Sequence, residues 1–292
     1  MTGIQNKTDR TKLEMKNKVV LITGASSGIG KALAEQMSRS GGRIYELARS
    51  LPDYFSDPAQ ECVTEQQGCR RPVCLDVTDA EAVKTVIEKI IQTENRIDLF
   101  VQAAGYGLAG AVEDTSPDEA QAQMMTNFLG SVFPLAPVLA QMRRQHAGLV
   151  VQIGSVAGFL PIPFQAFYSA SKAAIAALFQ AMANEVRPYG IRCLIVQPGD
   201  TKTGFTQSRI MSRLSAQSVY TNRCGRSIEK MADDEQNGMA PERIARLIIR
   251  QINKRRPPLF YTPGLTFKAA AFARRFLPMK FINCILYRMY AQ

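Results

Sequence analysis

The sequence contains a single histidine, His146, and none of its cysteines forms a Cys-x-x-Cys pair. Zinc sites are built from clustered Cys, His and carboxylate ligands, so no metal site is expected. The six cysteines are scattered along the chain. This distribution indicates reduced thiols and a cytosolic setting, and it does not suggest a disulfide framework.

Long apolar runs are also missing. No run reaches the roughly 18 residues that a membrane-spanning helix requires. Residues 1–16 are polar and lack the apolar segment of a secretory signal, so we expect them to form a loose tail. These absences predict a cytoplasmic protein. Association with a membrane remains an alternative, because of the charge distribution at the other end of the chain.

Acidic residues are absent from Gln251 onward, whereas eight lysines and arginines occur there. The formal net charge of +11 is therefore mostly a property of this end of the chain. A basic segment of this kind favours anionic membrane surfaces or nucleic acid, although a basic helix is more often a solvated face. No nucleic-acid-binding fold is recognisable, so nucleic acid is not an expected partner.

The sequence alternates between apolar, β-branched runs and helical patterns, and it is 46% hydrophobic. Strands are expected at 18–23, 43–48, 72–77, 96–105, 148–155, 191–199 and 258–262. Helices are expected at 29–40, from Asp79, at 117–145 with interruptions at Pro134 and Pro137, at 168–187 and at 241–252. The alternation predicts an α/β, Rossmann-type doubly wound parallel sheet of about seven strands with helices on both faces. We expect one domain over 17–264 and a C-terminal extension over 265–292.

Ligands bind such sheets beyond the carboxyl ends of the strands. The first strand ends in TGASSGIG, residues 23–30. Glycines allow the backbone to approach a pyrophosphate closely, and the following helix presents free N–H groups. A glycine cluster alone is weak evidence, but its position between a buried strand and a helix makes it specific. The candidate residues of this loop are Gly24, Ser26, Ser27, Gly28, Ile29 and Gly30.

Two charged residues follow the next strands. Arg49 ends the second strand, where an arginine suits the 2′-phosphate of NADP and an acid would suit the ribose of NAD. It can also be an ordinary surface arginine. Asp76 ends the third strand and is expected to accept from an adenine amino group, to cap the next helix, or to do both.

Ser155 ends the fifth strand, and Tyr168 and Lys172 lie in the next helical segment. Residues four apart on a helix share a face. A nearby ammonium is expected to lower the pKa of Tyr168, which would then exchange a proton with a carbonyl or alcohol oxygen. Ser155 would hydrogen-bond the same oxygen. A tyrosine–lysine pair at this spacing is common by chance. Its occurrence together with Ser155 and the phosphate loop argues against a coincidence.

In combination these motifs make the chain resemble the short-chain dehydrogenases/reductases, over about Lys18 to Thr262. The motifs are TGASSGIG, LDVT (75–78), Asn127, Ser155, YSASK (168–172) and PGDTKT (198–203). The resemblance implies a nicotinamide-dependent oxidoreductase with an Asn127–Ser155–Tyr168–Lys172 tetrad, in which Lys172 also bonds the nicotinamide ribose and Asn127 helps to hold a proton-relaying water. It further implies cofactor contacts from Val77, Ala104, Gly105, Pro198, Gly199, Thr201 and Thr203, besides Tyr168 and Lys172.

The chain departs from the family pattern at two places. QAAG (102–105) replaces the usual NNAG, so a side-chain bond between neighbouring strands is expected to be lost at Ala103, at a cost in stability. Ser27 stands where NADP-preferring members often have a basic residue. The preference for NADP(H) over NAD(H) therefore depends mainly on Arg49.

Several segments bear on the substrate and on partners. Residues 204–238 lack periodicity and occupy the place of the family's mobile substrate lid. Ser155, Phe159 and Phe205 are the expected substrate-binding residues, and Leu160 and Phe164 add to an apolar pocket; each of these aromatic and aliphatic side chains can equally belong to the core. The alanine-rich helix is expected to form a homodimer or homotetramer interface, as in the family.

The extension over 265–292 has apolar residues at roughly helical spacing with basic residues between them, which predicts an amphipathic helix pair broken near Pro278. Its layout is similar to family members that act on hydroxysteroids, retinoids and other lipophilic substrates. It is expected to pack over the domain, to contact a subunit partner, or to lie on a membrane surface.

Two function hypotheses follow. The first is an NADP(H)-dependent oxidoreductase that interconverts a lipophilic ketone and a secondary alcohol, with Tyr168 as the acid–base group. The second is a non-catalytic dinucleotide-binding or membrane-associated scaffold. The complete tetrad favours the first hypothesis, because a scaffold does not need Tyr168 and Lys172 together.

Overall fold

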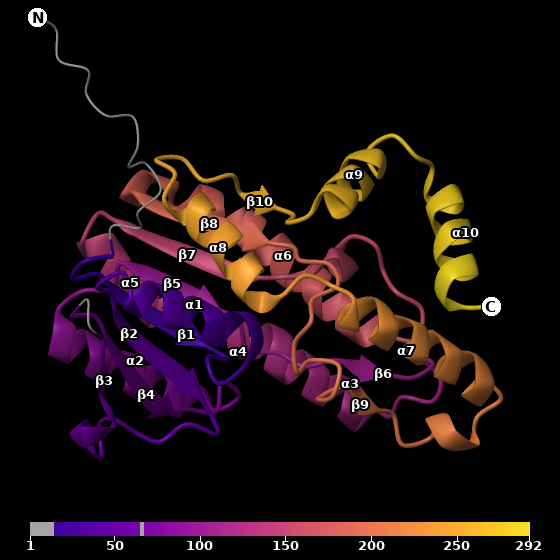
Figure 1. The fold of residues 1–292 in the computed structure, drawn as a ribbon, viewed down its shortest axis with the longest axis horizontal. Coiled ribbons are helices and arrows are strands. Elements are labelled where there is room, and N and C mark those ends of the chain that lie inside the picture. Colours follow the sequence, from indigo (N-terminus) through magenta and orange to yellow (C-terminus); the bar gives the residue numbers. More distant parts are fainter. Residues whose placement is uncertain (1–14, 65–66) are drawn as a thin grey trace, which may run out of the picture.

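The computed structural model describes residues 15–64 and 67–292, and it is built around one central sheet (Figure 1). The strand order is β10-β8-β7-β5-β1-β2-β4-β3. All neighbours pair in parallel except β3, which is antiparallel to β4. The strands are β1 Val19–Thr23, β2 Arg43–Ala48, β3 Cys62–Val63, β4 Cys69–Cys74, β5 Leu99–Gln102, β7 Gly148–Ile153, β8 Ile191–Val196 and β10 Phe260–Tyr261. The predicted doubly wound parallel sheet is confirmed.

Helices cover both faces of this sheet, because central strands such as β1 are apolar on both sides. In β1, Val19 and Leu21 pack into one core and Val20 and Ile22 into the other. The first core is closed by α2 Ala80–Glu94, α5 Leu135–Arg144 and α6 Ala166–Val186, and the second by α1 Gly28–Ser38 and α8 Pro241–Ile252. On the side of the first core, beside α6, run α3 Pro117–Met124, a π-helical turn Met125–Leu129 and α4 Gly130–Val132.

The predicted long helix at 117–145 is divided where its prolines occur. Pro134 stands at the cap position before α5, and Pro137 lies in the first turn of α5. Proline cannot donate the helical hydrogen bond but is tolerated in a first turn, which explains the break. Asp79, not Asp76, caps α2, because its carboxylate accepts from the Ala82 N–H at 3.0 Å.

The boundaries of the third parallel strand were predicted wrongly. β4 is Cys69–Cys74, three residues earlier than the expected 72–77. The strand contains Arg70 and Arg71, which obscure its apolar pattern. Both arginines have partners on neighbouring segments: Arg70 pairs with Glu46 at 2.6 Å and Arg71 pairs with Glu61 at 2.6 Å.

The segment 204–238 is not a loop throughout. It contains β9 Ile210–Met211, which pairs with β6 Leu108–Ala109, and the helix α7 Thr221–Gln236. The buried side of α7 consists of Cys224, Ser227 and Met231, at helical spacing. Two of these side chains are small, so the buried face of the helix leaves no strong hydrophobic period in the sequence.

The two ends of the chain were predicted unequally well. Residues 1–14 of the expected tail lie outside the described residues, whereas Met15 is buried in the second core. At the other end, α9 Leu265–Ala273 and α10 Met279–Tyr290 lie on either side of Pro278, as predicted. Figure 1 shows both of them in yellow, extending away from the central sheet. None of the helices in the described part of the chain has the length and apolar character to cross a membrane.

Packing of α6 on the sheet can be tested at Phe179, which is fully buried. Replacement by alanine leaves a cavity beneath the helix that carries Tyr168 and Lys172. We expect Phe179→Ala to lower the free energy of unfolding by about 3–5 kcal/mol in urea denaturation. Gln180→Ala, on the exposed side of the same helix, should change it by less than about 0.5 kcal/mol. Equal losses in both variants would contradict this packing.

Candidate active site

A cavity of about 410 Å³ opens at the carboxyl edge of the sheet. It lies where the strand order reverses, between β1 and β5, which is the usual ligand site of such sheets. Every expected cofactor-binding residue lines it: Gly24, Ser26, Ser27, Gly28, Ile29, Gly30, Arg49, Asp76, Val77, Ala104, Gly105, Tyr168, Lys172, Pro198, Gly199, Thr201 and Thr203.

The loop between β1 and α1 forms a cradle that only glycine permits. Gly24 has φ +67°, and a Cβ atom there would lie 2.6 Å from the backbone nitrogen of Ala104. A Cβ atom at Gly30 would overlap the Gly24 carbonyl oxygen. Ser27 stands at the N-cap of α1 without a side-chain capping bond, and the first turn contains no acid. The first N–H groups of α1 therefore remain available to an anionic group, which fits a dinucleotide pyrophosphate.

Arg49 and Asp76 lie at the rim of the same cavity. The Arg49 side chain is 78% exposed, and its Nη1 is 3.9 Å from Asp76 Oδ2. Burial opposes ionisation of Asp76, but hydrogen bonds from Thr78 and the charge of Arg49 outweigh it, so its pKa lies below the ordinary value. Because Thr78 occupies Oδ1 with both its N–H and its hydroxyl, Oδ2 is the oxygen left to face a ligand.

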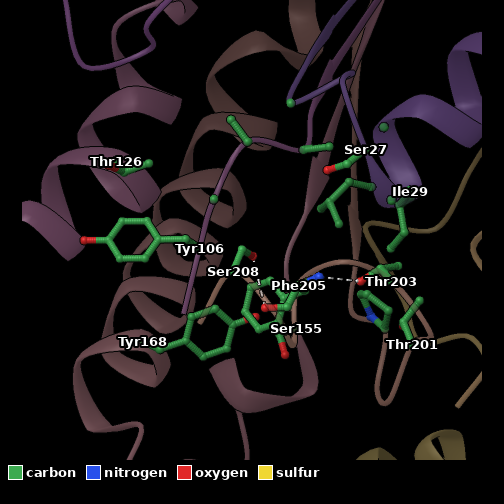
Figure 2. Close-up of a pocket in the computed structure, with 18 of the residues that line it drawn as sticks. Ser27, Ile29, Tyr106, Thr126, Ser155, Tyr168, Thr201, Thr203, Phe205 and Ser208 are labelled. Carbon is green, nitrogen blue, oxygen red and sulfur yellow. Dashed lines mark hydrogen bonds between the residues drawn. The ribbon is translucent and has the colours of Figure 1, made fainter. Parts of the chain in front are cut away.

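Ser155, Tyr168 and Phe205 gather at the opposite end of the cavity from Ser27 and Ile29 (Figure 2). Ser155 begins the turn after β7, and its hydroxyl accepts from the Ala157 N–H at 3.1 Å. Tyr168 lies in the first turn of α6 and is 8% exposed. Lys172, one turn later, donates to the Ile153 carbonyl oxygen at 3.1 Å. The strand end and the helix thus bring a hydroxyl, a phenol and an ammonium to one wall.

The pKa of Tyr168 is shifted in the direction opposite to the sequence-based expectation. Burial raises it to about 12, although the Ser155 hydroxyl acts to lower it. The Lys172 ammonium lies 5.7 Å from the ring centroid and bonds to a carbonyl instead of the phenol oxygen. Burial also lowers the pKa of Lys172 to about 8. At neutral pH Tyr168 therefore carries its proton and is equipped to donate it.

Asn127 lies in the π-helical turn and is fully buried. Its Oδ1 accepts from the Tyr106 N–H at 3.1 Å, and its Nδ2 donates to the Tyr106 carbonyl at 3.0 Å and to Ser171 Oγ at 3.2 Å. It does not line the cavity. A Cβ atom at Gly105 would lie 3.1 Å from Asn127 Oδ1 and 3.6 Å from Lys172 Nζ. Asn127 thus fixes the backbone beside Lys172.

The side chain missing at Ala103 is replaced by a hydroxyl from the neighbouring strand. Thr23 Oγ1, at the end of β1, accepts from the N–H groups of Ala103 at 3.2 Å and Ala104 at 3.4 Å. The Gln102 side chain points away from β1, and its Nε2 donates a hydrogen bond to the Ser131 carbonyl oxygen at 2.7 Å. The ends of β1 and β5 therefore remain tied despite the departure from the family pattern.

The expected substrate residues divide into two groups. Phe205 lines the cavity, and its ring lies 5.5 Å from that of Tyr168. Phe159 is buried and does not line the cavity. Its ring packs against Arg274 of the C-terminal extension, whose guanidinium carbon lies 5.9 Å from the ring centroid. Leu160 and Phe164 do not line it either; Phe164 packs on Tyr220.

Sequence reasoning missed several lining residues. Tyr106 lies four residues beyond the end of β5, next to the expected cofactor residue Gly105, so the strand-end rule could have found it. Asp200, Glu235 and Tyr290 come from the segment after β8, from α7 and from α10. Burial, together with the charges of Asp234 and Glu235, raises the pKa of Asp200 to about 6. Nothing local in the sequence indicates that α7 and α10 reach the cavity.

The chain matches the sequence profile of the short chain dehydrogenase family over residues 18–213, and it belongs to this family. Among individual proteins, it is 36% identical over 245 residues to a 3-ketodihydrosphingosine reductase of Bacteroides thetaiotaomicron, covering 84% of this chain and 87% of that protein. It is 29% identical over 258 residues to human 17-beta-hydroxysteroid dehydrogenase type 1, covering 85% and 77%. The resemblance to hydroxysteroid-type members is thereby confirmed.

Solved structures with this fold have been determined with both nicotinamide cofactors. A short chain dehydrogenase/reductase from Burkholderia phymatum in complex with NAD has a TM-score of 0.74 at 21% identity, covering 90% of this chain and 93% of that one. An alcohol dehydrogenase from Thermococcus sibiricus complexed with 5-hydroxy-NADP has a TM-score of 0.67 at 26% identity, covering 84% and 94%. The fold thus accommodates a nicotinamide dinucleotide of either kind.

The buried ammonium of Lys172 makes a prediction about stability. Its pKa in the folded protein, about 8, is lower than the ordinary 10.5. The folded state therefore disfavours the charge; this cost is complete below pH 8 and disappears as pH rises to 10.5. We expect Lys172→Met, without cofactor, to raise the free energy of unfolding at pH 7 by about 3 kcal/mol. The gain should shrink as pH rises from about 8 to 10.5 and should be absent above pH 10.5.

Urea unfolding at pH 7 and above pH 10.5 measures how the free energy of unfolding differs between Lys172→Met and the parent. Lys84→Met, at an exposed position on α2, is the matched control and should show no pH-dependent gain. A Lys172→Met protein that is less stable than the parent at pH 7 would mean that the site stabilises the ammonium.

Proposed function

We propose that the protein is an NADP(H)-dependent oxidoreductase that transfers a hydride between the nicotinamide and a lipophilic ketone or secondary alcohol. The observation that carries this proposal is the shared wall of Ser155, Tyr168 and Lys172 in the cavity that also contains the glycine cradle. A protonated phenol, a hydroxyl and a cation beside a dinucleotide site are what carbonyl reduction requires.

In the reducing direction a dinucleotide held by the glycine cradle would supply the hydride that the carbonyl carbon accepts. Tyr168 donates its phenolic proton to the carbonyl oxygen, so that the carbonyl becomes an alcohol and the phenol becomes a phenolate. Ser155 donates a hydrogen bond to that oxygen while negative charge develops on it. Lys172, buried one helical turn away, stabilises the phenolate that remains until it is reprotonated. Asn127 acts indirectly, by fixing the strand end against Lys172.

The preference for NADP(H) is supported by Arg49. Its guanidinium is largely exposed at the cavity rim and is held only loosely by Asp76. It is therefore free to pair with a ribose 2′-phosphate, which an arginine binds through two parallel hydrogen bonds. An uncharged ribose hydroxyl would gain much less from this side chain.

A lipophilic substrate is supported by the wall beside Tyr168 and by the relatives. Phe205 packs on the Tyr168 ring, and Ile162 and Met231 also line the cavity. The two relatives described above are named for 3-ketodihydrosphingosine and for a 17-beta-hydroxysteroid. We propose a substrate that presents a ketone or secondary alcohol on an extended apolar body.

We also propose a cytosolic homo-oligomer that forms through α6. The exposed side of α6 carries Ala170, Ala173, Ala177 and Ala181. Such small residues let a second helix approach closely. The cysteines, which are all free thiols, support the cytosolic location. Sedimentation of the parent beside Ala177→Arg would separate the oligomer from a monomer.

Replacement of the proton donor tests the chemistry. We expect Tyr168→Phe to reduce turnover of a ketone with NADPH at least about 100-fold, because general-acid assistance is lost. Cofactor affinity, measured by quenching of fluorescence, should change little. Tyr106→Phe, at another cavity-lining tyrosine, is the control. Retained turnover in Tyr168→Phe would exclude the assignment, and absence of turnover in the parent with a broad panel of ketones would favour a non-catalytic scaffold.

Replacement of the rim arginine tests cofactor choice. We expect Arg49→Asp to weaken NADPH binding about 10- to 100-fold, since a charge-assisted pair with the 2′-phosphate is replaced by repulsion. NADH binding should fall by less than about threefold. Arg243→Asp, on the exposed side of α8, should affect neither cofactor. Equal losses for both cofactors would remove the basis for an NADP preference.

A further inference from the structure

The two C-terminal helices bury little of their own apolar surface. No residue of α9 is buried, and Ile282 is the buried residue of α10. The exposed fractions are 86% for Leu265, 63% for Phe272, 72% for Phe276 and 53% for Phe281. Aromatic side chains with this exposure are not accounted for by packing within the chain.

The inner side of α9 is nevertheless anchored to the catalytic domain. The Phe267 ring lies directly against Gly199, so that a Cβ atom at this glycine would overlap it. Arg274 packs over the Phe159 ring, and Lys268 lies 5.4 Å from the Tyr261 ring centroid. These contacts fix which side of α9 faces the domain.

The inner side of α10 is anchored to α7. The Tyr290 hydroxyl donates to Asp234 Oδ2 at 3.3 Å, and Arg223 Nε donates to the Ala291 carbonyl at 2.9 Å. Tyr290 lines the cavity, and Phe267 touches one of its lining residues. The helix pair is therefore held beside the cavity, and its other side is left to solvent.

We define that other side as the outer face, which consists of the exposed apolar residues Leu265, Phe272, Phe276, Phe281, Ile285 and Met289. Arg275, in the turn between the two helices, and Lys280 and Arg288, on α10, are exposed and make no ion pair among the described residues. With no acid after residue 251, the surface is both apolar and uniformly positive.

We propose that the outer face of α9 and α10 docks on an anionic phospholipid surface. Apolar side chains would enter the interface while lysines and arginines pair with lipid phosphates, which is the behaviour of amphipathic basic helices. The helices have 9 and 12 residues, too few to span a bilayer, so the contact is peripheral. The cavity would then lie next to the lipid surface.

A second copy of the chain is a less suitable occupant. A two-fold contact would set the same patch against itself. Arg275, Lys280 and Arg288 of the two copies would then lie opposite one another, with no acid after residue 251 to compensate them. Like charges in a desolvated contact are costly, whereas an anionic lipid surface neutralises them.

Vesicle flotation with the full-length protein tests this proposal without any need for turnover. We expect the protein to float with vesicles of phosphatidylcholine and phosphatidylglycerol, to float less at high salt, and to bind vesicles of phosphatidylcholine alone weakly. Arg275→Gln, Lys280→Gln and Arg288→Gln together should weaken binding roughly 100-fold, at about fivefold for each charge removed. Lys84→Gln, Arg144→Gln and Arg187→Gln together are the matched control and should bind as the parent does.

The apolar contribution is tested with Phe276→Ser and Phe281→Ser together, which should also release the protein from anionic vesicles. Val63→Ser and Val219→Ser, at positions 65% and 88% exposed elsewhere on the surface, form the control pair. Circular dichroism and NADPH binding should match the parent in all variants, so that loss of folding is recognised separately.

Three outcomes would overturn the proposal. These are no flotation of the parent with anionic vesicles, equal flotation of the outer-face variants and the parent, or a smaller mass by sedimentation for Phe276→Ser with Phe281→Ser. The last result would identify the outer face as a contact between copies.

Discussion

The parallel pairing of β1 with β5 is the contact on which the rest of the site depends. The strand order reverses there, so the crossovers leave in opposite directions and a crevice remains at the carboxyl ends of the two strands. Gly24 lets the ends approach closely, and the Thr23 hydroxyl ties them through Ala103 and Ala104. The glycine cradle follows β1 directly, and the Asn127-bound segment that supports Lys172 follows β5. Both halves of the cavity are therefore positioned by one strand pair.

Much of the fold follows from the sequence, because continuous β-branched runs and glycine ends are local signals. Errors occurred where a residue's partner lies far away in the sequence. Arg70 and Arg71 conceal the start of β4, since the acids that satisfy them belong to β2, to a loop and to α2. Helix α7 was missed because its buried side uses Cys224 and Ser227 in place of larger apolar residues. Neither case can be recognised without the tertiary contacts.

The candidate site shows the same division. Gly24, Arg49 and Asp76 could be located in the sequence because they stand at or near the ends of predicted strands, whereas Thr201 and Thr203 were located through the family resemblance. Tyr290 could not be located, since its place in the cavity wall depends on how α10 packs on α7. The direction of the Tyr168 pKa shift was also beyond the sequence: it depends on whether burial or the neighbouring charge dominates, and Lys172 turns its ammonium toward the Ile153 carbonyl.

The close contact between Gly199 and the Phe267 ring restricts which residues can occupy both positions. Gly199 belongs to the segment expected to contact the nicotinamide, yet the nearest atoms on its open side are those of the Phe267 ring. A side chain at position 199 has room only where residue 267 is smaller. We therefore expect changes at these two positions to be coupled in related sequences: a side chain at position 199 requires α9 to be reshaped, and loss of the extension removes the constraint.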